Sequence, residues 1–359
     1  MKKTLTLLLA LLSVTTFAQT TCTGVAWVSN WNEFTTALNN FNVRSINLCS
    51  NLTATSKAYI PTNQGTIKEI EGHGFDINIP STIDTGLVRT FPSLTLANGG
   101  IDQQLRFRNV SFKGGDNNMC MYISANYGMR FEGCRFYNFK TALDLRWCMD
   151  AVIDQCFFWE NYIGVNLDYD RFSGGSNSTS CSNHPRIENC KFRNSAGDFA
   201  NICIYACSGA MINHNIFEGI QSGGDYDVYF DDKGSPVVKE VNMFGNHVEH
   251  IPAIASFYIK LKEGFAQCGG IYSQYNCTLI KFESSAYAKC IVSEIPYLTS
   301  SAKFQNVNSA GRWWFINLPA SFDPNSATYW VGTPPTNSRI DNWNSNGQSP
   351  YIQLGTRKL

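Results

Sequence analysis

A repeated eight-residue line in the middle of the chain limits what this protein can fold into. Met129–Phe136, Ala151–Phe158 and Pro185–Phe192 superpose position by position, each with an apolar third residue, a Cys at the sixth position and a closing Phe. Looser copies stand before and after them, at Leu105–Phe112 and Ala210–Phe217. The five closing phenylalanines are separated by 24, 22, 34 and 25 residues. A period in the low twenties with one long insertion is typical of a solenoid.

A second, shorter alternation of apolar and polar residues accompanies these lines. It is seen at Leu143–Leu145, Val165–Leu167, Val228–Phe230 and Phe257–Ile259. Alternation over three to five residues indicates short half-buried strands, and no repeat has a helical pattern. Two or three such strands per coil of about 22 residues build a parallel β-helix, whose coils bury a continuous core only by stacking. We therefore predict an all-β, single-stranded parallel β-helix solenoid.

The lines ending in Cys-x-Phe resemble those of the right-handed parallel β-helix, or pectin-lyase-like, superfamily, in which polar side chains form ladders at a turn of each coil. The resemblance extends over roughly Val43 to Cys290. It implies a right-handed coil, an amphipathic helix covering the first coil, and a substrate cleft on one sheet of the enzymes that share the fold. It implies no single activity, because this scaffold carries lyases, hydrolases, isomerases, adhesins and phage tail spikes.

The first 18 residues have the features of a secretory signal peptide. Lys2 and Lys3 precede the apolar stretch Leu5–Leu12, and Thr16–Ala18 is a small-x-small cleavage site. The apolar stretch is too short to span a membrane, and no other stretch of the chain is a candidate span. The leader holds two of the 28 basic residues and none of the 28 acidic ones, so the mature chain is nearly neutral. This charge argues against nucleic acid or an anionic membrane as the main partner, and the leader predicts a secreted, periplasmic or cell-surface protein.

Both ends of the solenoid require a cap, because an open coil exposes its core and its strand edge. At the N-terminal end, residues 19–42 contain one amphipathic helix, Asn30–Asn40, in which Asn30 is the cap and Phe34, Leu38 and Phe41 share a face. Residues 43–290 form the β-helix, beginning with a strand at Val43–Leu48. Residues 291–359 are an irregular, aromatic-rich C-terminal cap or tail. Three roles stay open for this tail: closing the last coil, binding sugars, or packing against another subunit.

Thirteen cysteines in an exported chain would ordinarily indicate a disulfide framework. Cys134, Cys156 and Cys190 occupy one repeat position, however, and a stack of small inward side chains suits free buried thiols. We expect bridges at the two ends of the stack instead. The expected pairs are Cys22 with Cys49 and Cys268 with Cys277. A further pair could form between two of the three cysteines that share one turn, which are Cys148, Cys181 and Cys207.

One outward strand face gathers the side chains with the most chemistry. In the second alternation the apolar residues point into the core, so the residues between them point outward. Successive coils stack about 4.8 Å apart, so the outward residues of neighbouring coils lie side by side. The outward strip predicted in this way contains the candidate catalytic residues Asp144, Arg146, Asp168, Asp227, Asp231 and Lys260. The candidate substrate-binding residues are Tyr122, Asn166, Asp170, Arg171, Tyr205 and Tyr229. Polar groups interleaved with aromatic rings suit a sugar chain, which presents hydroxyl groups and apolar ring faces.

The strip permits several chemistries. Asp144 with Asp168, or Asp227 with Asp231, would serve as acid and base in glycoside hydrolysis. Carboxylates of the strip would instead hold Ca²⁺ beside a uronate in a lyase, with Arg146, Arg171 or Lys260 as the base. The alternative is that these are solvated polar residues, because outward positions of a half-buried strand are polar in any case.

Three classes of function follow. The first is an exported β-helix that binds a polysaccharide or cell-surface glycan, with or without cleaving it as a lyase or glycoside hydrolase. The second is a non-catalytic adhesin or envelope protein, and the third is a carbohydrate-binding protein like a phage tail spike. Gly72–Gly74 matches the Gly-His-Gly motif of polygalacturonase-like hydrolases, but the Asp231–Asp232 pair follows it instead of preceding it. We therefore interpret Gly72 and Gly74 as turn residues and His73 as an exposed histidine.

Overall fold

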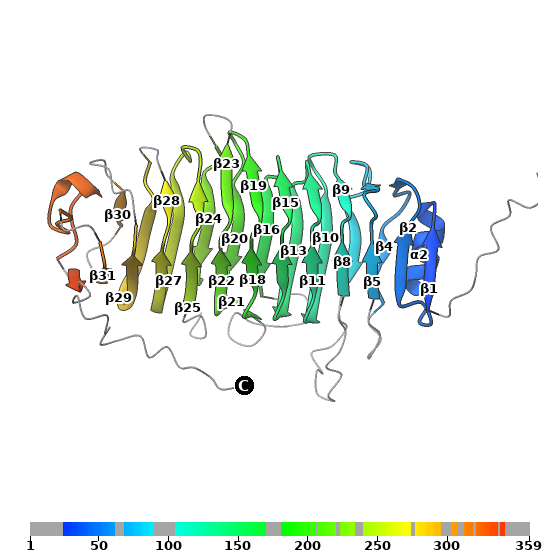
Figure 1. Ribbon diagram of the computed structural model, residues 1–359, viewed down its shortest axis with the longest axis horizontal. Helices are drawn as coiled ribbons and strands as arrows, with labels where there is room; N and C mark the ends of the chain where they lie inside the picture. Colours follow the sequence, from blue (N-terminus) through cyan, green and yellow to red (C-terminus); the bar gives the residue numbers. More distant parts are fainter. Residues whose placement is uncertain are drawn as a thin grey trace, which may run out of the picture.

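The fold is seen in a computed structural model of the chain. It describes residues 24–61, 68–89, 105–169, 181–205, 207–219, 223–233, 240–273, 277–295, 303–307, 312–318, 321–336 and 338–341. The chain winds into an all-β parallel solenoid of about nine turns, with one α-helix at the N-terminal end (Figure 1). Every strand pairing in the described residues is parallel, as the repeat predicts.

The strands stack in three columns, which we number in the order in which a coil visits them. The first column and the third column belong to one large sheet of 24 strands, and the second column is a separate sheet of nine. The second column consists of β3 (Leu52–Thr53), β6 (Asp76–Asn78), β9 (Ser111–Lys113), β12 (Arg135–Tyr137), β15 (Phe157–Trp159), β19 (Lys191–Asn194), β23 (Ile216–Gly219), β26 (His247–Val248) and β28 (Tyr272–Ser273).

The large sheet bends because several of its strands continue around a corner. The first column contains β1 (Val25–Val28), β2 (Ser45–Leu48), β5 (Lys68–Glu71), β8 (Leu105–Arg108), β11 (Arg130–Glu132), β14 (Val152–Asp154), β18 (Arg186–Glu188), β22 (Ala210–Asn213), β25 (Glu240–Phe244), β31 (Arg312–Ile316) and β33 (Ser338–Asp341). The third column contains β4 (Ala58–Tyr59), β7 (Thr85–Arg89), β10 (Met119–Tyr127), β13 (Thr141–Met149), β16 (Ile163–Asp168), β20 (Ala200–Tyr205), β24 (Tyr226–Asp231), β30 (Phe304–Asn306) and β32 (Trp330–Val331). The long strands β27 (Ala255–Gly269) and β29 (Ile280–Ser293) serve both columns, and β17 (Ser182–Asn183) and β21 (Cys207–Ser208) pair at the corner.

The repeated line is explained by the turn between the first and second columns. The residue after each of β8, β11, β14 and β18 adopts a left-handed conformation, with φ of 50° at Asn109, 63° at Gly133, 53° at Gln155 and 55° at Asn189. This conformation is cheap for Gly and tolerable for Asn. The fifth position of the repeat is therefore a turn position, and the Cys that follows it points into the core.

The core contains the predicted stack of phenylalanines. Phe112, Phe136, Phe158, Phe192 and Phe217 are at most 1% exposed. Their successive ring centroids are 5.2, 4.8, 4.7 and 5.4 Å apart, with nearly parallel planes. Stacking at one-coil spacing buries large apolar surfaces, and this stack links the coils from β9 to β23.

The repeat-position cysteines are buried and free, as predicted, and asparagines take over the same position further along. The Cys190 amide donates to Asn215 Oδ1 (2.9 Å), and Asn215 Nδ2 donates to the Ile187 carbonyl (2.9 Å). Asn246 continues the ladder by donating to the Ile212 carbonyl (2.8 Å). These amides satisfy backbone groups at a corner that strand pairing cannot reach.

The predicted disulfide bridges are wrong for every pair that the structure describes. Cys268, Cys277, Cys148, Cys181 and Cys207 are all free thiols. Cys49 is also free, and Cys22 lies outside the described residues. Burial raises the pKa of Cys148 to about 12 and that of Cys207 well above its usual value, so these thiols stay protonated and behave as small apolar side chains.

Helix α2 (Trp31–Asn39) covers the first coil, as predicted. Asn30 Oδ1 accepts from the Glu33 amide (2.9 Å), and Glu33 Oε2 accepts from the Ser29 amide (2.7 Å), which together form a capping box. Two details differ from the prediction. Strand β1 precedes the helix, so the first strand is not at Val43–Leu48, and Phe41 lies beyond the helix with 51% of its surface exposed.

A buried lysine holds the other end of this helix. Lys68 Nζ donates to the carbonyls of Ala37 (3.4 Å), Asn40 (2.5 Å) and Val43, and only 4% of the residue is exposed. The Ala37 and Asn40 carbonyls also accept from the backbone amides of Asn40 (3.2 Å) and Val43 (3.0 Å), so the ammonium group reinforces the turn at the helix C-terminus.

We expect Lys68→Ala to lower the free energy of unfolding by about 1–3 kcal/mol, because it removes three buried, charge-assisted hydrogen bonds at the end of the helix. Chemical denaturation measures this value. The control is Lys57→Ala, which removes an exposed ion pair with Asp84 (3.0 Å) and should cost roughly 0–1 kcal/mol. Equal losses in the two variants would show that Lys68 does not act as a cap.

The parallel pairing continues beyond Cys290. Strand β31 pairs with β29, and β33 pairs with β31, so the first column extends to Asp341. Trp313 and Trp330 are buried there, with ring centroids 4.9 Å apart. The aromatic residues of the tail therefore fill the last coils, and residues 342–359, including Trp343, lie outside the described part of the chain.

Candidate functional site

The outer face of the third column gathers most of the predicted site residues. The strand register sets Tyr122, Asp144 and Asn166 in one row, and it sets Asp231, Lys260 and Glu283 in another. We refer to this surface as the outer strip and define it by Tyr122, Asp144, Arg146, Asn166, Asp168, Tyr205, Tyr229, Asp231, Tyr258, Lys260 and Glu283.

Asp144 is held by its neighbours and is turned away from solvent. Both of its carboxylate oxygens accept from Arg146, with Nη2 3.0 Å from Oδ2, and Oδ1 also accepts from Asn166 Nδ2 at 2.9 Å. Only 2% of the residue is exposed. The Arg146 guanidinium also lies over the Tyr122 ring, 5.4 Å from its centroid. A bidentate pair of this kind is a strong, charge-assisted interaction. Because its carboxylate is engaged in this pair, Asp144 has a structural role.

At this end of the outer strip the predicted outward side chains are shielded from solvent. Asp168 is 3% exposed and Asn166 is 8% exposed, and Asp168 Oδ1 accepts from the Tyr169 amide at 2.8 Å. The sequence pattern places these side chains on the outer face correctly, but lateral hydrogen bonds between coils replace the expected contact with water. Asp144 and Asp168 are therefore a poor acid–base pair for glycoside hydrolysis.

An aromatic cluster occupies the centre of the outer strip. The rings of Phe199, Tyr205, Tyr226 and Tyr258 have centroids 5.0, 5.8, 5.1 and 5.0 Å from the Tyr229 centroid. Together with Ala200, Cys203 and Ala255, these residues make an apolar cluster on the outside of the solenoid, separate from the core. Of the rings, those of Phe199, Tyr205 and Tyr229 are half-buried, so part of each faces solvent.

The phenols of this cluster are neutral hydrogen-bonding groups. Burial raises the pKa of Tyr229 to about 12, and the nearby Asp231 carboxylate adds to the effect. Burial also raises the pKa of Tyr205 and of Tyr258, in the latter with the help of its hydrogen bond to Glu283. All three phenols keep their protons at neutral pH and can donate to a hydroxyl oxygen.

Charged groups flank the cluster on one side. Lys260 Nζ lies 3.9 Å from an Asp231 oxygen and 3.7 Å from a Glu283 oxygen. Tyr258 donates to Glu283 Oε2 at 2.5 Å, and Lys233 Nζ lies over the Tyr205 ring, 3.5 Å from its centroid. Carboxylate, ammonium and phenol thus meet within one coil spacing at the edge of the aromatic surface.

Asp227 is not part of the outer strip, and this predicted position is wrong. It is fully buried, and its Oδ1 lies 2.7 Å from His250 Nε2 and accepts from Asn201 Nδ2 at 3.1 Å. Tyr226 packs in the outer cluster whereas Val228 packs in the core, so the alternation breaks at the corner between them. Asp227 and Asp231 therefore face different sides of the sheet and do not form an acid–base pair.

Two predicted residues, Asp170 and Arg171, lie outside the described residues, together with the loop Gly174–Ser180. The sequence reasoning also missed several members of the site, namely Phe199, Tyr226, Lys233, Tyr258 and Glu283. Tyr258 lies within the alternation at Phe257–Ile259, and Glu283 follows Ile280 and Phe282 in the corresponding alternation one coil later. Extending the alignment by one coil would have found Glu283, whereas Phe199 joins the site from a corner without a periodic signal.

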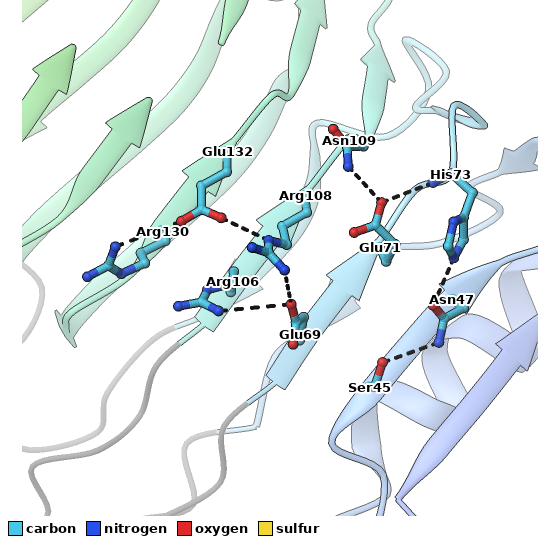
Figure 2. A network of polar contacts seen from close by, with 10 residues as sticks. All are labelled: Ser45, Asn47, Glu69, Glu71, His73, Arg106, Arg108, Asn109, Arg130 and Glu132. Atoms are coloured by element: carbon cyan, nitrogen blue, oxygen red, sulfur yellow. Dashed lines mark hydrogen bonds and ion pairs between the residues drawn. The ribbon is translucent and has the colours of Figure 1, made fainter. Parts of the chain in front are cut away.

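A second charged surface lies on the first column (Figure 2). Arg108 donates to Glu69 (3.0 Å) and Glu132 (2.8 Å), while Arg106 lies 4.0 Å from Glu69 and Arg130 lies 3.8 Å from Glu132. Each arginine here has a glutamate from its own or the next coil. This network joins adjacent coils and gives each of its three arginines a glutamate partner, which is consistent with a structural role.

A separate group of polar contacts beside this network includes His73 (Figure 2). Its Nε2 lies 2.9 Å from Asn47 Oδ1, and its ring stacks on Trp27 at 5.5 Å. His73 is exposed, as predicted, and its φ of 51° and the φ of 85° at Gly74 mark a tight turn.

The donor set of the outer strip does not fit a calcium site. Asp144 already binds Arg146 and Asn166, and Asp231 and Glu283 share Lys260. Within the described ranges, no group of three or more His, Cys, Asp or Glu side chains is arranged to hold a metal ion. Calcium needs six to eight oxygen ligands, which these residues do not supply.

Comparison with known proteins gives one family match and several similar folds. Residues 25–138 match the model of a pectate lyase-like adhesive domain. Tailspike protein 3 of bacteriophage CBA120 is 12% identical, with a TM-score of 0.46, and the match covers 89% of this chain and 59% of that one. The SRRP protein of L. reuteri 53608 is 9% identical, with a TM-score of 0.31, covering 88% of this chain and 98% of that one.

A tailspike protein of E. coli bacteriophage HK620, in complex with a pentasaccharide, is 10% identical, with a TM-score of 0.31, covering 88% of this chain and 62% of that one. The chain thus spans about three fifths of the length of the tailspike proteins. No curated protein matches the sequence. In the described part of the chain, no helix is long and apolar enough to cross a membrane. The stacked parallel coils give this chain a parallel β-helix fold, and the match of residues 25–138 to a pectate lyase-like domain agrees with the predicted resemblance to the pectin-lyase-like superfamily.

Proposed function

We propose that this chain binds a polysaccharide or a cell-surface glycan on the outer strip, with Tyr229 at the centre of the site. The observation that carries the proposal is the aromatic cluster on the outside of the solenoid, where four rings lie 5.0–5.8 Å from Tyr229. Aromatic side chains on a surface are amphipathic, since their faces are apolar and phenols carry a hydroxyl. A sugar ring presents the complementary combination of apolar C–H faces and hydroxyl groups.

The charged groups beside the cluster supply the polar half of such a site. Asp231 and Glu283 accept hydrogen bonds from sugar hydroxyls, and Lys260 donates to them. These groups already form a network with one another, so they are preorganised for a ligand at little entropic cost. Tyr205, Tyr229 and Tyr258 come from the three successive strands β20, β24 and β27, so the surface extends along the solenoid axis and suits more than one sugar unit.

The geometry favours binding without cleavage. Asp144 is buried against Arg146, and Asp227 is buried against His250, so neither of the predicted acid–base pairs has two carboxylates at the surface. An adhesive role also agrees with the description of the matched family as an adhesive domain. A protein with this role acts outside the cell, and the signal peptide predicted over residues 1–18 would supply export.

A glycoside hydrolase remains the second candidate, on one specific observation. Asp231 and Glu283 both lie within 4 Å of Lys260 Nζ, so their carboxylates stand on either side of one cation. If these residues are catalytic, Glu283→Gln abolishes release of reducing ends from a bound polysaccharide while the binding affinity changes little. Incubation of the chain with a polysaccharide panel, with and without Ca²⁺, tests both this activity and the lyase alternative.

We expect Tyr229→Ala to weaken glycan binding by about tenfold or more, because it removes the central ring of the site. Affinity electrophoresis against a polysaccharide panel, followed by titration of the best ligand, measures this change. Tyr229→Phe should retain most of the affinity, since the stacking surface survives.

Tyr137→Ala is the matched control, because Tyr137 is an outer tyrosine of the second column that packs edge-on against Phe157 at 5.9 Å. The proposal predicts unchanged binding in this variant. Loss of binding in both variants would point to a general loss of folding, which circular dichroism detects. Full affinity in a folded Tyr229→Ala protein would place the site elsewhere.

A further inference from the structure

The corner between the second and third columns carries apolar side chains that the core does not use. Tyr162 and Ile251 are each 43% exposed there, and Ile254 is 39% exposed. Backbone hydrogen bonds stack this corner coil on coil, since the Tyr162 carbonyl accepts from the Phe199 amide (3.0 Å) and the Asp225 carbonyl accepts from the Ile254 amide (3.1 Å). Exposed apolar side chains grouped on one surface are typical of an interaction site.

Carboxylates accompany these apolar side chains along the same corner. Glu160, Asp198 and Asp225 come from three successive coils, and the Asp225 amide donates to the Asp198 carbonyl (2.9 Å). Burial raises the pKa of Asp198, and the nearby Glu160 carboxylate adds to the effect. In the part of the chain that the structure describes, none of the three forms an ion pair with a lysine or an arginine. We refer to this surface as the corner ridge and define it by Glu160, Tyr162, Asp198, Asp225, Ile251 and Ile254.

The outer face of the second column has the opposite charge. The strand register sets Arg135, Phe157 and Lys191 in one row, at the positions where β12, β15 and β19 begin. Phe157 is half-buried and Arg135 is exposed. Lys191 Nζ lies 2.5 Å from Glu218 Oε1, whereas Arg135 has no carboxylate partner among the described residues.

A stacked arginine and tryptophan lie on the same face. The Arg193 guanidinium carbon is 4.0 Å from the centroid of the Trp159 ring, and within the described ranges Arg193 also lacks a carboxylate partner. Tryptophan and arginine are the residue types most enriched at the hot spots of protein interfaces. We refer to this surface as the basic face and define it by Arg135, Phe157, Trp159, Lys191 and Arg193.

The order in which a coil visits the columns places these two surfaces at opposite edges of one side of the solenoid. The row of Arg135 lies where the second-column strands begin, and the corner ridge lies beyond the point where they end. A two-fold axis parallel to the solenoid turns the second column of one copy toward that of another and exchanges these edges. Each corner ridge then faces the strand starts of the other copy at the same coil level. A two-fold interface of this kind forms two identical contacts at once and is the commonest in homo-oligomers.

We propose that two copies of this chain associate side by side in this way, with the corner ridge of each against the basic face of the other. Glu160 of one copy faces Arg135 of the other. Tyr162 packs against Phe157 in the same contact. The complementary charges fix the register of the interface, and the aromatic side chains contribute most of its affinity. The interface does not depend on the function proposed for the outer strip, because the third columns of the two copies point to opposite sides.

The test is sedimentation of the full chain over a range of concentrations, about 1–100 µM. We expect a concentration-dependent dimer that added NaCl weakens, because the paired charges lie at the surface. Glu160→Arg, Arg135→Glu and Tyr162→Ser should each weaken association by about tenfold or more. The double variant Glu160→Arg with Arg135→Glu should regain most of the wild-type affinity, since it restores the ion pair with its signs exchanged.

Arg186→Glu and Tyr59→Ser are the matched controls, because Arg186 is an exposed arginine of the first column and Tyr59 is a 61% exposed tyrosine of the third. Both should dimerise like the wild type, and so should Tyr229→Ala, which separates the interface from the outer strip. A chain that stays monomeric over the whole range, or that forms a trimer, would overturn the proposal. A dimer that Glu160→Arg and Tyr162→Ser leave intact would do the same. Binding of poly-lysine to a monomeric chain, abolished by Glu160→Arg, would assign the corner ridge to a basic partner and overturn the self-association.

Discussion

Replacing Phe158 by Ala should lower the free energy of unfolding by about 3–5 kcal/mol, the cost of emptying a core position that cannot collapse. Phe158 is 1% exposed and lies between Phe136 and Phe192, with ring centroids 4.8 and 4.7 Å away. The neighbouring coils are fixed by backbone pairing on both sides, so they cannot close the space that the ring leaves. Urea denaturation followed by circular dichroism measures the loss.

The adjacent residue provides the control for this experiment. Phe157 points outward from the same strand and packs edge-on against Tyr137, where it is only half-buried. Phe157→Ala removes the same number of atoms but opens no internal cavity, so we expect a clearly smaller loss. A loss in Phe157→Ala as large as that in Phe158→Ala would contradict the division of this strand into an inner and an outer face.

Replacing Asp227 by Ala should also cost about 3–5 kcal/mol, because it leaves a buried histidine without its partner. Both side chains are fully buried, and Asp227 Oδ1 lies 2.7 Å from His250 Nε2. The loss is expected in the free energy of unfolding and not in glycan affinity, since Asp227 does not reach the outer strip. Reduced glycan binding in a folded Asp227→Asn protein would restore Asp227 to the site.

The same pair predicts a pH dependence of stability. Burial works against the charged form of His250, but the charge of Asp227 and their hydrogen bond outweigh it, so the pKa of His250 is raised. A raised pKa means that the folded protein binds the proton more tightly than the unfolded chain does. The stabilisation is therefore fully present below the unfolded pKa of about 6.5 and is lost as pH rises through the folded pKa.

Melting temperatures measured from about pH 6 to pH 9 across the ordinary histidine pKa should therefore fall in the wild-type protein and stay flatter in His250→Gln. His184→Gln is the control, because His184 is exposed and should leave the wild-type profile unchanged. An identical decline in His250→Gln and the wild type would show that His250 is neutral in the folded protein throughout this range.

Local patterns in the chain were sufficient to predict the coil. The spacing of the closing phenylalanines predicts the stack from Phe112 to Phe217, since a residue that recurs once per coil meets its own copies above and below. The capping box at Asn30 and Glu33 predicts the start of α2, because that signal lies within one turn of the helix. The left-handed turn after β8, β11 and β18 falls on the Asn or Gly at the fifth position of the repeated line.

The candidate site was predicted only in part. Alternation placed Tyr205, Tyr229, Asp231 and Lys260 on the outer face correctly, because side-chain direction along a strand is a local property. It failed at Asp227, where the strand turns a corner and one residue departs from the alternation. The prediction of disulfide bridges failed for a related reason, because the distance between two thiols depends on how the coils stack and not on the local sequence.

The sequence by itself determined the coil, the residues that face its core and the helix that covers its first turn. Tertiary structure alone decided which outward groups meet solvent. Asp144 faces outward but is buried by Arg146 and Asn166, whereas the Lys260 side chain on the same outer strip stays 43% exposed. The physical reason is that exposure on the outer face depends on side-chain contacts within a strand, such as that of Arg146, and with the next coil, such as that of Asn166, which a period-two pattern does not record.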